Sequence, residues 1–167
     1  GMTFIEVLIA LVIIVTGILG AVAMQASAKK GSFDAMQRSL ASGLAQDIIE
    51  RMRSNSADVA ILDAYAGTYG GISSGARCNT VAACTPANMV VSDLVEWTSL
   101  LQGAEAKVGG KNAGGLVSAV GCIVHANQVV TVTISWQGRT ETSDGGSGVC
   151  GTSSKTRRQI SLTSFIF

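Results

Sequence analysis

The sequence has little charge, almost no histidine or proline, and few aromatic residues. Charged residues make up 14% of its 167 residues and the net charge is +1, against about 25% charged residues in typical soluble domains. This balance excludes a strongly basic nucleic-acid-binding protein and an acidic tail protein. A single histidine, His125, largely excludes histidine-based catalytic and zinc sites. The two glycine-rich segments do not have the pattern of a phosphate-binding loop. We therefore expect no active site, no metal and no cofactor.

The apolar residues are concentrated near the N-terminus. Val7–Met24 reads VLIALVIIVTGILGAVAM, and its one polar residue is Thr16. With Phe4 and Ile5 before it, the run reaches the ~20 residues that span a bilayer core. A secretory signal peptide is an alternative, but it requires a basic region before the apolar run, and none precedes it here. Glu6 is a functional candidate, because a carboxylate in lipid must find a partner or lie at the headgroup level.

The stretch GMTFIEVLIALVIIVTGILG closely resembles the N-terminus of the type IV pilins and pseudopilins. A glycine, a hydrophobic residue, Thr, two apolar residues and Glu directly precede the long apolar run, and this motif is specific. The resemblance implies that a membrane peptidase cuts after Gly1 and methylates Met2, and that Thr3 and Glu6 serve assembly. Met2 departs from the phenylalanine common in major pilins, but minor pilins tolerate it.

Further segments resemble one branch of these proteins, the PilV family of minor pilins. They are GILGAVAMQ, ASGLAQDIIERMRSN, SDLVEWTSLLQG, VTVTISW and RRQISLTSFI, and they cover nearly the whole chain. The resemblance implies an α+β fold of the type IV pilin kind, in which a long N-terminal helix packs on a small antiparallel sheet. It also implies a minor pilin that primes type IV pilus assembly, is incorporated at or near the pilus tip, and supports motility and adhesion.

The same resemblance implies the location and the partners. The chain would lie in the bacterial inner membrane with a periplasmic head, and then in the extracellular pilus. Its partners would be the other minor pilins, the major pilin, the prepilin peptidase, the inner-membrane assembly platform and a tip adhesin.

Three other functions remain open. A minor pseudopilin of type II secretion shares the N-terminal features, whereas the segments around Trp97 and Trp136 favour PilV. A DNA-binding competence pilin would use the basic cluster of Lys155, Arg157 and Arg158, although a solvated strand edge guarded by charge explains the cluster better. The third, a membrane-anchored periplasmic enzyme, has no support in the sequence.

Beyond Met24 an apolar stripe continues at steps of three and four residues, which predicts an amphipathic helix. The stripe comprises Phe33, Met36, Leu40, Leu44, Ile48 and Met52. We expect a leader glycine at residue 1, the membrane or filament-core half of a helix at 2–25, its amphipathic half at 26–54, a connecting region at 55–115, and an antiparallel sheet at 116–167. Four glycines, at 17, 20, 31 and 43, would mark bends or close helix contacts, or are simply tolerated.

The connecting region predicts a loop at 67–88 and a short helix near 93–102. Asp93 and Glu96 have the spacing of a capping box at its start. Its buried side would comprise Leu94, Trp97, Leu100 and Leu101. Strands are expected at 116–125, 128–136 and 157–167, with a tight turn at Ala126-Asn127.

Four cysteines, on the oxidising side of the membrane, indicate disulfide bonds. Three pairings are possible. We favour Cys78–Cys84, which closes a short loop, and Cys122–Cys150, which ties a glycine-rich excursion to the sheet. A metal site is the alternative, but the spacing of Cys78 and Cys84 is not that of a zinc knuckle.

Overall fold

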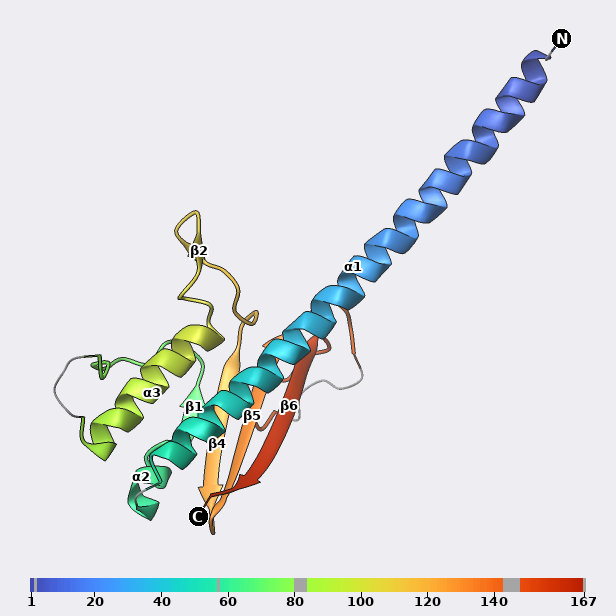
Figure 1. Ribbon diagram of the computed structural model, residues 1–167. Helices are drawn as coiled ribbons and strands as arrows, with labels where there is room; N and C mark the ends of the chain where they lie inside the picture. Colours follow the sequence, from blue (N-terminus) through green and yellow to red (C-terminus); the bar gives the residue numbers. More distant parts are fainter. Residues whose placement is uncertain (2, 57, 80–83, 143–147, 167) are drawn as a thin grey trace. The chain divides into compact units, whose positions relative to one another are not determined.

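The computed structural model describes residues 1, 3–56, 58–79, 84–142 and 148–166. The chain divides into two units, Gly1–Met36 and Gln37–Phe167, and each is described by itself. The elements (Figure 1) are α1 (Phe4–Ser54), α2 (Val59–Asp63), β1 (Gly67–Tyr69), α3 (Pro86–Leu101), β2 (Lys107–Val108), β3 (Lys111–Asn112), β4 (Val120–Ala126), β5 (Val129–Gln137) and β6 (Arg157–Phe165). The expected α+β order, with a long helix first and antiparallel strands last, is confirmed.

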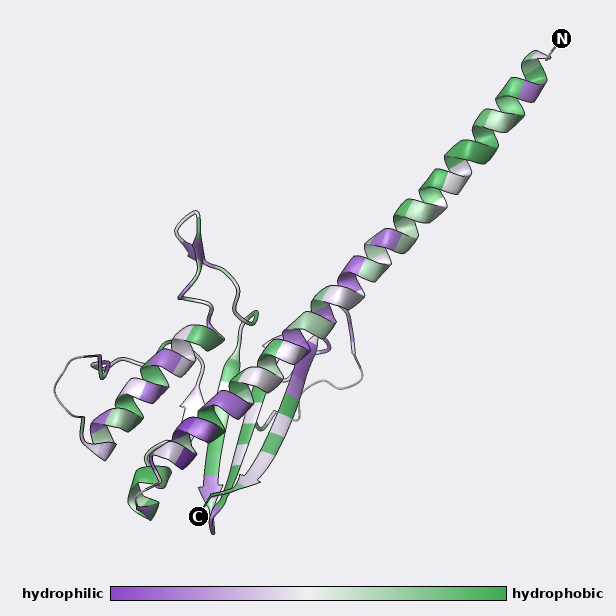
Figure 2. Cartoon of the chain, viewed as in Figure 1, coloured by the Kyte–Doolittle hydropathy of each residue, from purple (hydrophilic) through white to green (hydrophobic). Residues whose placement is uncertain are grey.

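The first unit consists of the N-terminal part of α1. Its apolar side chains are exposed, from Phe4 at 80% to Met24 at 73%. Figure 2 shows the first part of this helix as mostly hydrophobic, with a hydrophilic position near its start and further hydrophilic positions later in the unit. The helix is long and apolar enough to cross a membrane, by length and composition. Its side chains are therefore left for lipid or for other helices to cover.

The second unit begins where α1 acquires a buried face. Ala41, Ala45, Ile48 and Met52 are each fully buried, at spacings of three and four residues. The two alanines leave room for a close approach of the helix backbone to its neighbours. The helix ends at Ser54, as the sequence predicts.

A four-stranded antiparallel sheet has the strand order β1-β4-β5-β6. Alternate residues of β5 face α1, and Val130, Val132, Ile134 and Trp136 are all fully buried. The strand pattern of β5 and β6 matches the sequence prediction to within about two residues at each end.

The structure corrects the predicted turn between β4 and β5. The turn residues are Asn127 and Gln128, with φ angles of 51° and 64°, and Ala126 pairs with Val129 as the last rung of the ladder. Two successive positive φ angles are the geometry of the hairpin turn whose twist matches the flanking strands, and asparagine tolerates that conformation well.

Two other expectations were wrong in the connecting region. Gly67–Tyr69 is not loop but forms β1, which pairs with β4, so the sheet draws a strand from outside 116–167. The helix expected near 93–102 begins at Pro86 and ends at Leu101. Thr85 caps its N-terminus by accepting a hydrogen bond from the Asn88 amide, and proline suits the first helical turn because it needs no donor there.

Both favoured disulfides are present. Cys78 is bonded to Cys84 and Cys122 to Cys150, with Cα–Cα distances of 6.1 and 5.8 Å. The second bond holds Cys150, which follows β5 in the chain, against β4. Residues 80–83 and 143–147 lie outside the described part of the chain.

Candidate functional site

The predicted processing and assembly residues lie at the start of the first unit. Gly1, Thr3 and Glu6 are exposed, and Met2 lies outside the described residues. Glu6 occupies the first turn of α1, and its amide donates to the Thr3 carbonyl oxygen at 3.1 Å. The partial positive charge at a helix N-terminus favours a carboxylate there. Glu6 is therefore compatible with the helix start, and its side chain is free to meet another subunit.

The one polar side chain of the apolar run is satisfied within the helix. The Thr16 hydroxyl donates to the carbonyl oxygens of Val12 and Ile13, at 2.9 and 3.0 Å. A hydroxyl bonded in this way adds little cost in lipid. A Cβ atom added at Gly17 or Gly20 would meet nothing within 4 Å. Packing inside this chain therefore does not require these glycines. Because neither has a side chain, another helix can approach the α1 backbone closely at both positions.

A cluster of charged side chains joins α1 to α3 in the second unit. The Arg51 guanidinium donates to Asp47 Oδ2 at 2.9 Å, to Asp93 Oδ1 at 3.2 Å and to Glu96 Oε2 at 3.0 Å. Burial disfavours the charged guanidinium, but its hydrogen bonds to the carboxylates outweigh burial and raise the pKa of Arg51 above its ordinary value. Asp93 and Glu96 therefore lie inside α3 and form ion pairs with Arg51, and they are not the capping box that their spacing predicted.

The same cluster reaches the chain before β1. The Tyr65 hydroxyl donates to Asp93 Oδ2 at 2.5 Å, and Asn55 Nδ2 donates to the Tyr65 oxygen at 3.2 Å and to the Pro86 carbonyl at 2.9 Å. Burial, and then the hydrogen bond to Asp93, raise the pKa of the Tyr65 phenol. Each of these groups has a partner inside the head, so the cluster stabilises the fold and offers no reactive group.

Trp97 is the central side chain of the head. It is fully buried, and its indole Nε1 donates to the Leu44 carbonyl oxygen at 2.8 Å. The Tyr69 ring meets it edge-on, with ring centroids 5.9 Å apart. A Cβ atom at Gly121 would lie 2.3 Å from the indole, so β4 needs glycine where Trp97 crosses it. Leu100, predicted to be on the buried side with Trp97, is 38% exposed instead.

The contact between His125 and Asp63 is not indicated by the sequence. His125 falls within the strand expected at 116–125, and in β4 its Nδ1 lies 2.6 Å from Asp63 Oδ1 of α2. The two residues are 62 positions apart, and no local pattern indicates such a contact. The pair fastens the short α2 helix to the end of the sheet.

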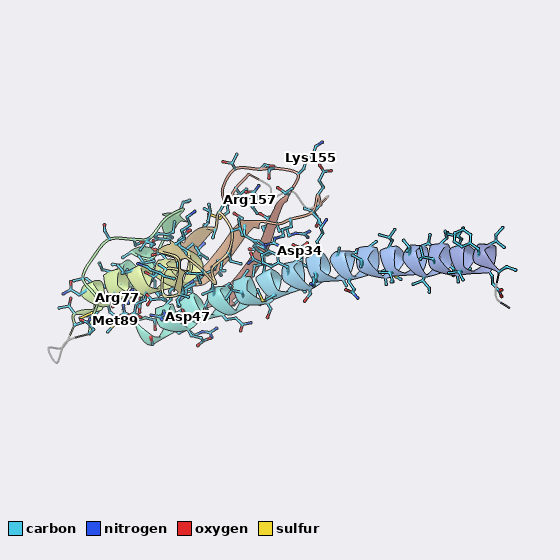
Figure 3. The ribbon with its side chains drawn as sticks, turned by 90° about the horizontal axis from the view of Figure 1, so that it is seen from above. Asp34, Asp47, Arg77, Met89, Lys155 and Arg157 are labelled. Atoms are coloured by element: carbon cyan, nitrogen blue, oxygen red, sulfur yellow. A yellow bond between two sulfur atoms is a disulfide. The ribbon has the colours of Figure 1, made fainter. Side chains whose placement is uncertain are left out.

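The basic cluster near the last strand is not a solvated patch. Arg157 is only 8% exposed, and its Nη2 donates to Ser135 Oγ at 2.8 Å. Burial lowers the pKa of Arg157. Arg158 is half-buried and donates to Thr140 Oγ1 at 2.7 Å. Of the three residues, Lys155 alone is exposed, on the side of the head away from α1 (Figure 3).

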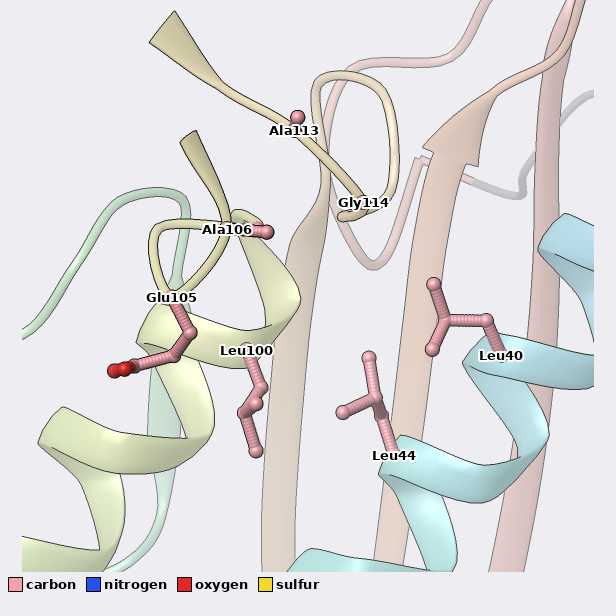
Figure 4. Close-up of a pocket in the computed structure, with 8 residues that line it drawn as sticks. Leu40, Leu44, Leu100, Glu105, Ala106, Ala113 and Gly114 are labelled. Carbon is pink, nitrogen blue, oxygen red and sulfur yellow. The ribbon is translucent and has the colours of Figure 1, made fainter. Parts of the chain in front are cut away.

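A shallow groove of about 150 Å³ opens between α1 and α3 (Figure 4). Leu40, Leu44 and Leu100 line it together with Ala106 and Ala113, and Glu105 stands at its rim. Glu105 is held by Arg77 at 2.7 Å. Within the described residues, no three His, Cys, Asp or Glu side chains are grouped as metal ligands. The groove is thus lined mainly by apolar side chains, and its one carboxylate, Glu105, is paired with Arg77.

Residues 23–95 match the family model of the type IV pilin Tt1218. This part of the chain is therefore similar to a type IV pilin. The matched segment begins at the end of the apolar run and ends within α3, so it includes Arg51, Tyr65 and Asp93 of the buried cluster. No curated protein and no solved structure matches the chain. The type IV pilin family is structural, and membrane anchoring and assembly with other pilus components are properties of the family.

Proposed function

We propose that this chain is a minor pilin of the PilV kind, which primes type IV pilus assembly together with other minor pilins. It enters the fibre at or near the tip and supports pilus-dependent motility and adhesion. The observation that carries the proposal is the uncovered apolar surface of α1 from Phe4 to Met24, with a single carboxylate, Glu6, in its first turn. Such a surface is stable in lipid or against other apolar helices, but not in water.

The minor-pilin part of the proposal rests on the head. Of the segments that resemble PilV, those beyond α1 fall on α3, β5 and β6, and they supply the two fully buried tryptophans, Trp97 and Trp136. A type II secretion pseudopilin is the nearest rival because it shares the features of α1. The DNA-binding competence pilin is weakened, since Arg157 is buried and not available to phosphates.

We further propose a role for the N-terminus. Cleavage after Gly1 would leave a free amine on Met2, and such an amine is cationic at neutral pH. In lipid, that cation and the Glu6 carboxylate of a neighbouring subunit neutralise each other. The pairing sets the axial register of the helices in the fibre core.

The proposal implies a path through the cell. The precursor lies in the inner membrane with its head in the periplasm, where the prepilin peptidase processes it. It then joins the other minor pilins, the major pilin and the assembly platform, and leaves with the fibre, carrying a tip adhesin.

Deletion of the gene tests the proposal, with surface pili counted and type II secretion assayed in the same strain. We expect few or no pili and normal secretion in the deletion strain, and the intact gene should restore the pili. Normal pili with failed secretion would make the chain a pseudopilin. Normal pili and normal secretion together would refute the priming role.

The Glu6 pairing is tested in the same strain by complementation with Glu6→Gln, which keeps the shape and removes the charge. We expect pili to remain absent although the protein reaches the membrane. The matched control is Glu50→Gln, because Glu50 lies on the exposed face of the same helix and forms an ion pair with Arg53 there. Full piliation with Glu6→Gln would remove the pairing from the proposal.

A further inference from the structure

The last strand of the sheet has a free edge. β6 stands at the end of the strand order and hydrogen-bonds to β5 on one side (Figure 1). At nine residues it is as long as the central strand β5, whereas the strand at the opposite edge, β1, has three. Natural sheets keep exposed edges short or guard them, because unpaired backbone groups bind other strands.

The ladder shows which backbone groups of β6 are free. Ile166 donates its amide to Gln128, and Gly138 donates to Thr156. In antiparallel pairing alternate residues bond the partner strand, so even-numbered residues of β6 face β5 and odd-numbered residues face outward. The outward residues beyond the buried Arg157 are Gln159, Ser161, Thr163 and Phe165. No described residue forms a backbone hydrogen bond with any of them outside the β5–β6 ladder.

The usual guards of an edge strand are missing from this stretch. Gln159–Phe165 reads QISLTSF, with no proline and no charged residue. The arginines that precede it do not protect it, because Arg157 is buried and turned onto Ser135. Ser161, Thr163 and Phe165 are all exposed.

We propose that the free edge of β6 pairs with an extended segment of another subunit of the pilus, which adds a fifth strand to the sheet. This inference rests on the proposed function, since it names how the head binds a neighbouring subunit. The partner should be an extended polypeptide, because the free groups at the edge of β6 are backbone N–H donors and C=O acceptors, which hydrogen-bond to another strand.

The side chains of β6 define the pattern of that segment. Ile160 and Leu162 are half-buried against the core, so apolar residues of the added strand extend this layer. Its polar residues lie beside Ser161 and Thr163 on the outer face. The occupant is thus a strand of alternating apolar and polar residues.

A different subunit fits better than a second copy of this chain. Two copies of β6 pair antiparallel only about a twofold axis that crosses the strands. β6 runs roughly along the part of α1 in the same unit (Figure 1). That axis would make this part of the two α1 helices antiparallel, whereas a strand from a different subunit can pair with β6 without such a reversal.

Thr163→Pro tests the inference. The Thr163 amide faces outward, so proline leaves the β5–β6 ladder intact and removes one donor from the free edge. The matched control is Thr163→Val, which removes the hydroxyl bonded to Thr131 but keeps the amide and the β-branched shape. Ser161→Pro is the second edge variant, so the test stands if one proline substitution prevents folding.

The full-length chain is co-expressed with the other minor pilins of its strain and purified in detergent. We expect the amides of Ser161, Thr163 and Phe165 to exchange hydrogen at least tenfold more slowly in the complex than in the chain alone. We also expect a proline variant that melts like the wild type to lose at least tenfold in recovered complex, while Thr163→Val does not.

Each other outcome has a distinct meaning. A complex in which these amides exchange as fast as in the free chain would overturn the inference and leave the proposed function standing. Protection that arises in the chain alone, at raised concentration, would assign the edge to a second copy and overturn the occupant proposed here. No complex at all, with normal pili in the deletion strain, would refute the proposed function and this inference with it.

Discussion

Replacement of Tyr65 by phenylalanine tests whether the buried cluster between α1 and α3 stabilises the head. The substitution removes the hydroxyl that donates to Asp93 Oδ2 at 2.5 Å and accepts from Asn55 Nδ2 at 3.2 Å, and it keeps the fully buried ring. Asp93 is 7% exposed, so water does not easily replace the lost donor. A hydrogen bond to a charged group contributes about 1.5–3 kcal/mol. We therefore expect the free energy of unfolding to fall by about 2 kcal/mol, or the melting temperature by about 6 °C.

The neighbouring tyrosine provides a matched control. Tyr69 donates its hydroxyl to the Tyr65 carbonyl at 2.7 Å, which is a neutral acceptor, so Tyr69→Phe should cost only about 1 kcal/mol. Both variants are measured in the full-length chain in detergent, by thermal melting followed in the near-ultraviolet circular dichroism of the tryptophans. If Tyr65→Phe cost no more than Tyr69→Phe, the buried carboxylate would not depend on the phenol, and the reasoning would fail.

Further predictions concern pH, the disulfides and the core. The raised pKa of Tyr65 means that the folded state holds the phenolic proton more tightly than the unfolded state does. The stability that this proton contributes is fully present below pH 10.0, the ordinary pKa of the phenol, and is lost as the pH rises beyond it. Tyr65→Phe should therefore reduce the drop in melting temperature at high pH. Replacement of Cys122 by serine removes the disulfide whose cysteines are 28 residues apart, and it should lower the free energy of unfolding by about 3.5 kcal/mol. Cys78→Ser removes the disulfide with a separation of 6 and should lower it by about 2.5 kcal/mol. Equal losses in denaturant titrations would contradict this order. Gly121→Ala forces a Cβ against the Trp97 indole and should cost about 1–3 kcal/mol; an unchanged melting temperature would show that the strand yields freely.

Short-range sequence patterns predict much of the fold. The apolar run and the stripe after it predict α1, because helical periodicity is a local property of the chain. The alternation in VTVTISW and RRQISLTSFI predicts β5 and β6 for the same reason. The spacing of the cysteines favoured the observed pairing, since each bond joins two cysteines that follow one another in the sequence.

The start of α3 was missed although a local signal exists. Thr85-Pro86 is a good cap and first turn for a helix, but glycines and two cysteines before it favoured a loop. The capping-box spacing of Asp93 and Glu96 then suggested a later start. Their partner is Arg51, which is separated from them by 42 and 45 residues, and only the folded head brings them together.

The assembly role of the N-terminal residues stays a prediction. Thr3 and Glu6 follow from a compact motif, and the structure leaves both exposed at the start of α1. The burial of Arg157 was not predictable, because it depends on how the segment after β5 returns over the sheet. The free edge of β6 was likewise invisible, since the strand order is a property of the whole fold.

The position of this chain in the fibre tests the central claim most directly. An epitope inserted between Gly109 and Gly110, in the exposed turn joining β2 and β3, marks the head without touching the four-stranded sheet. Pili are sheared from a strain in which the tagged chain restores piliation, and are then labelled with gold-conjugated antibody. A minor pilin that primes assembly predicts label at one end of the fibre. Label distributed along the shaft would contradict the account.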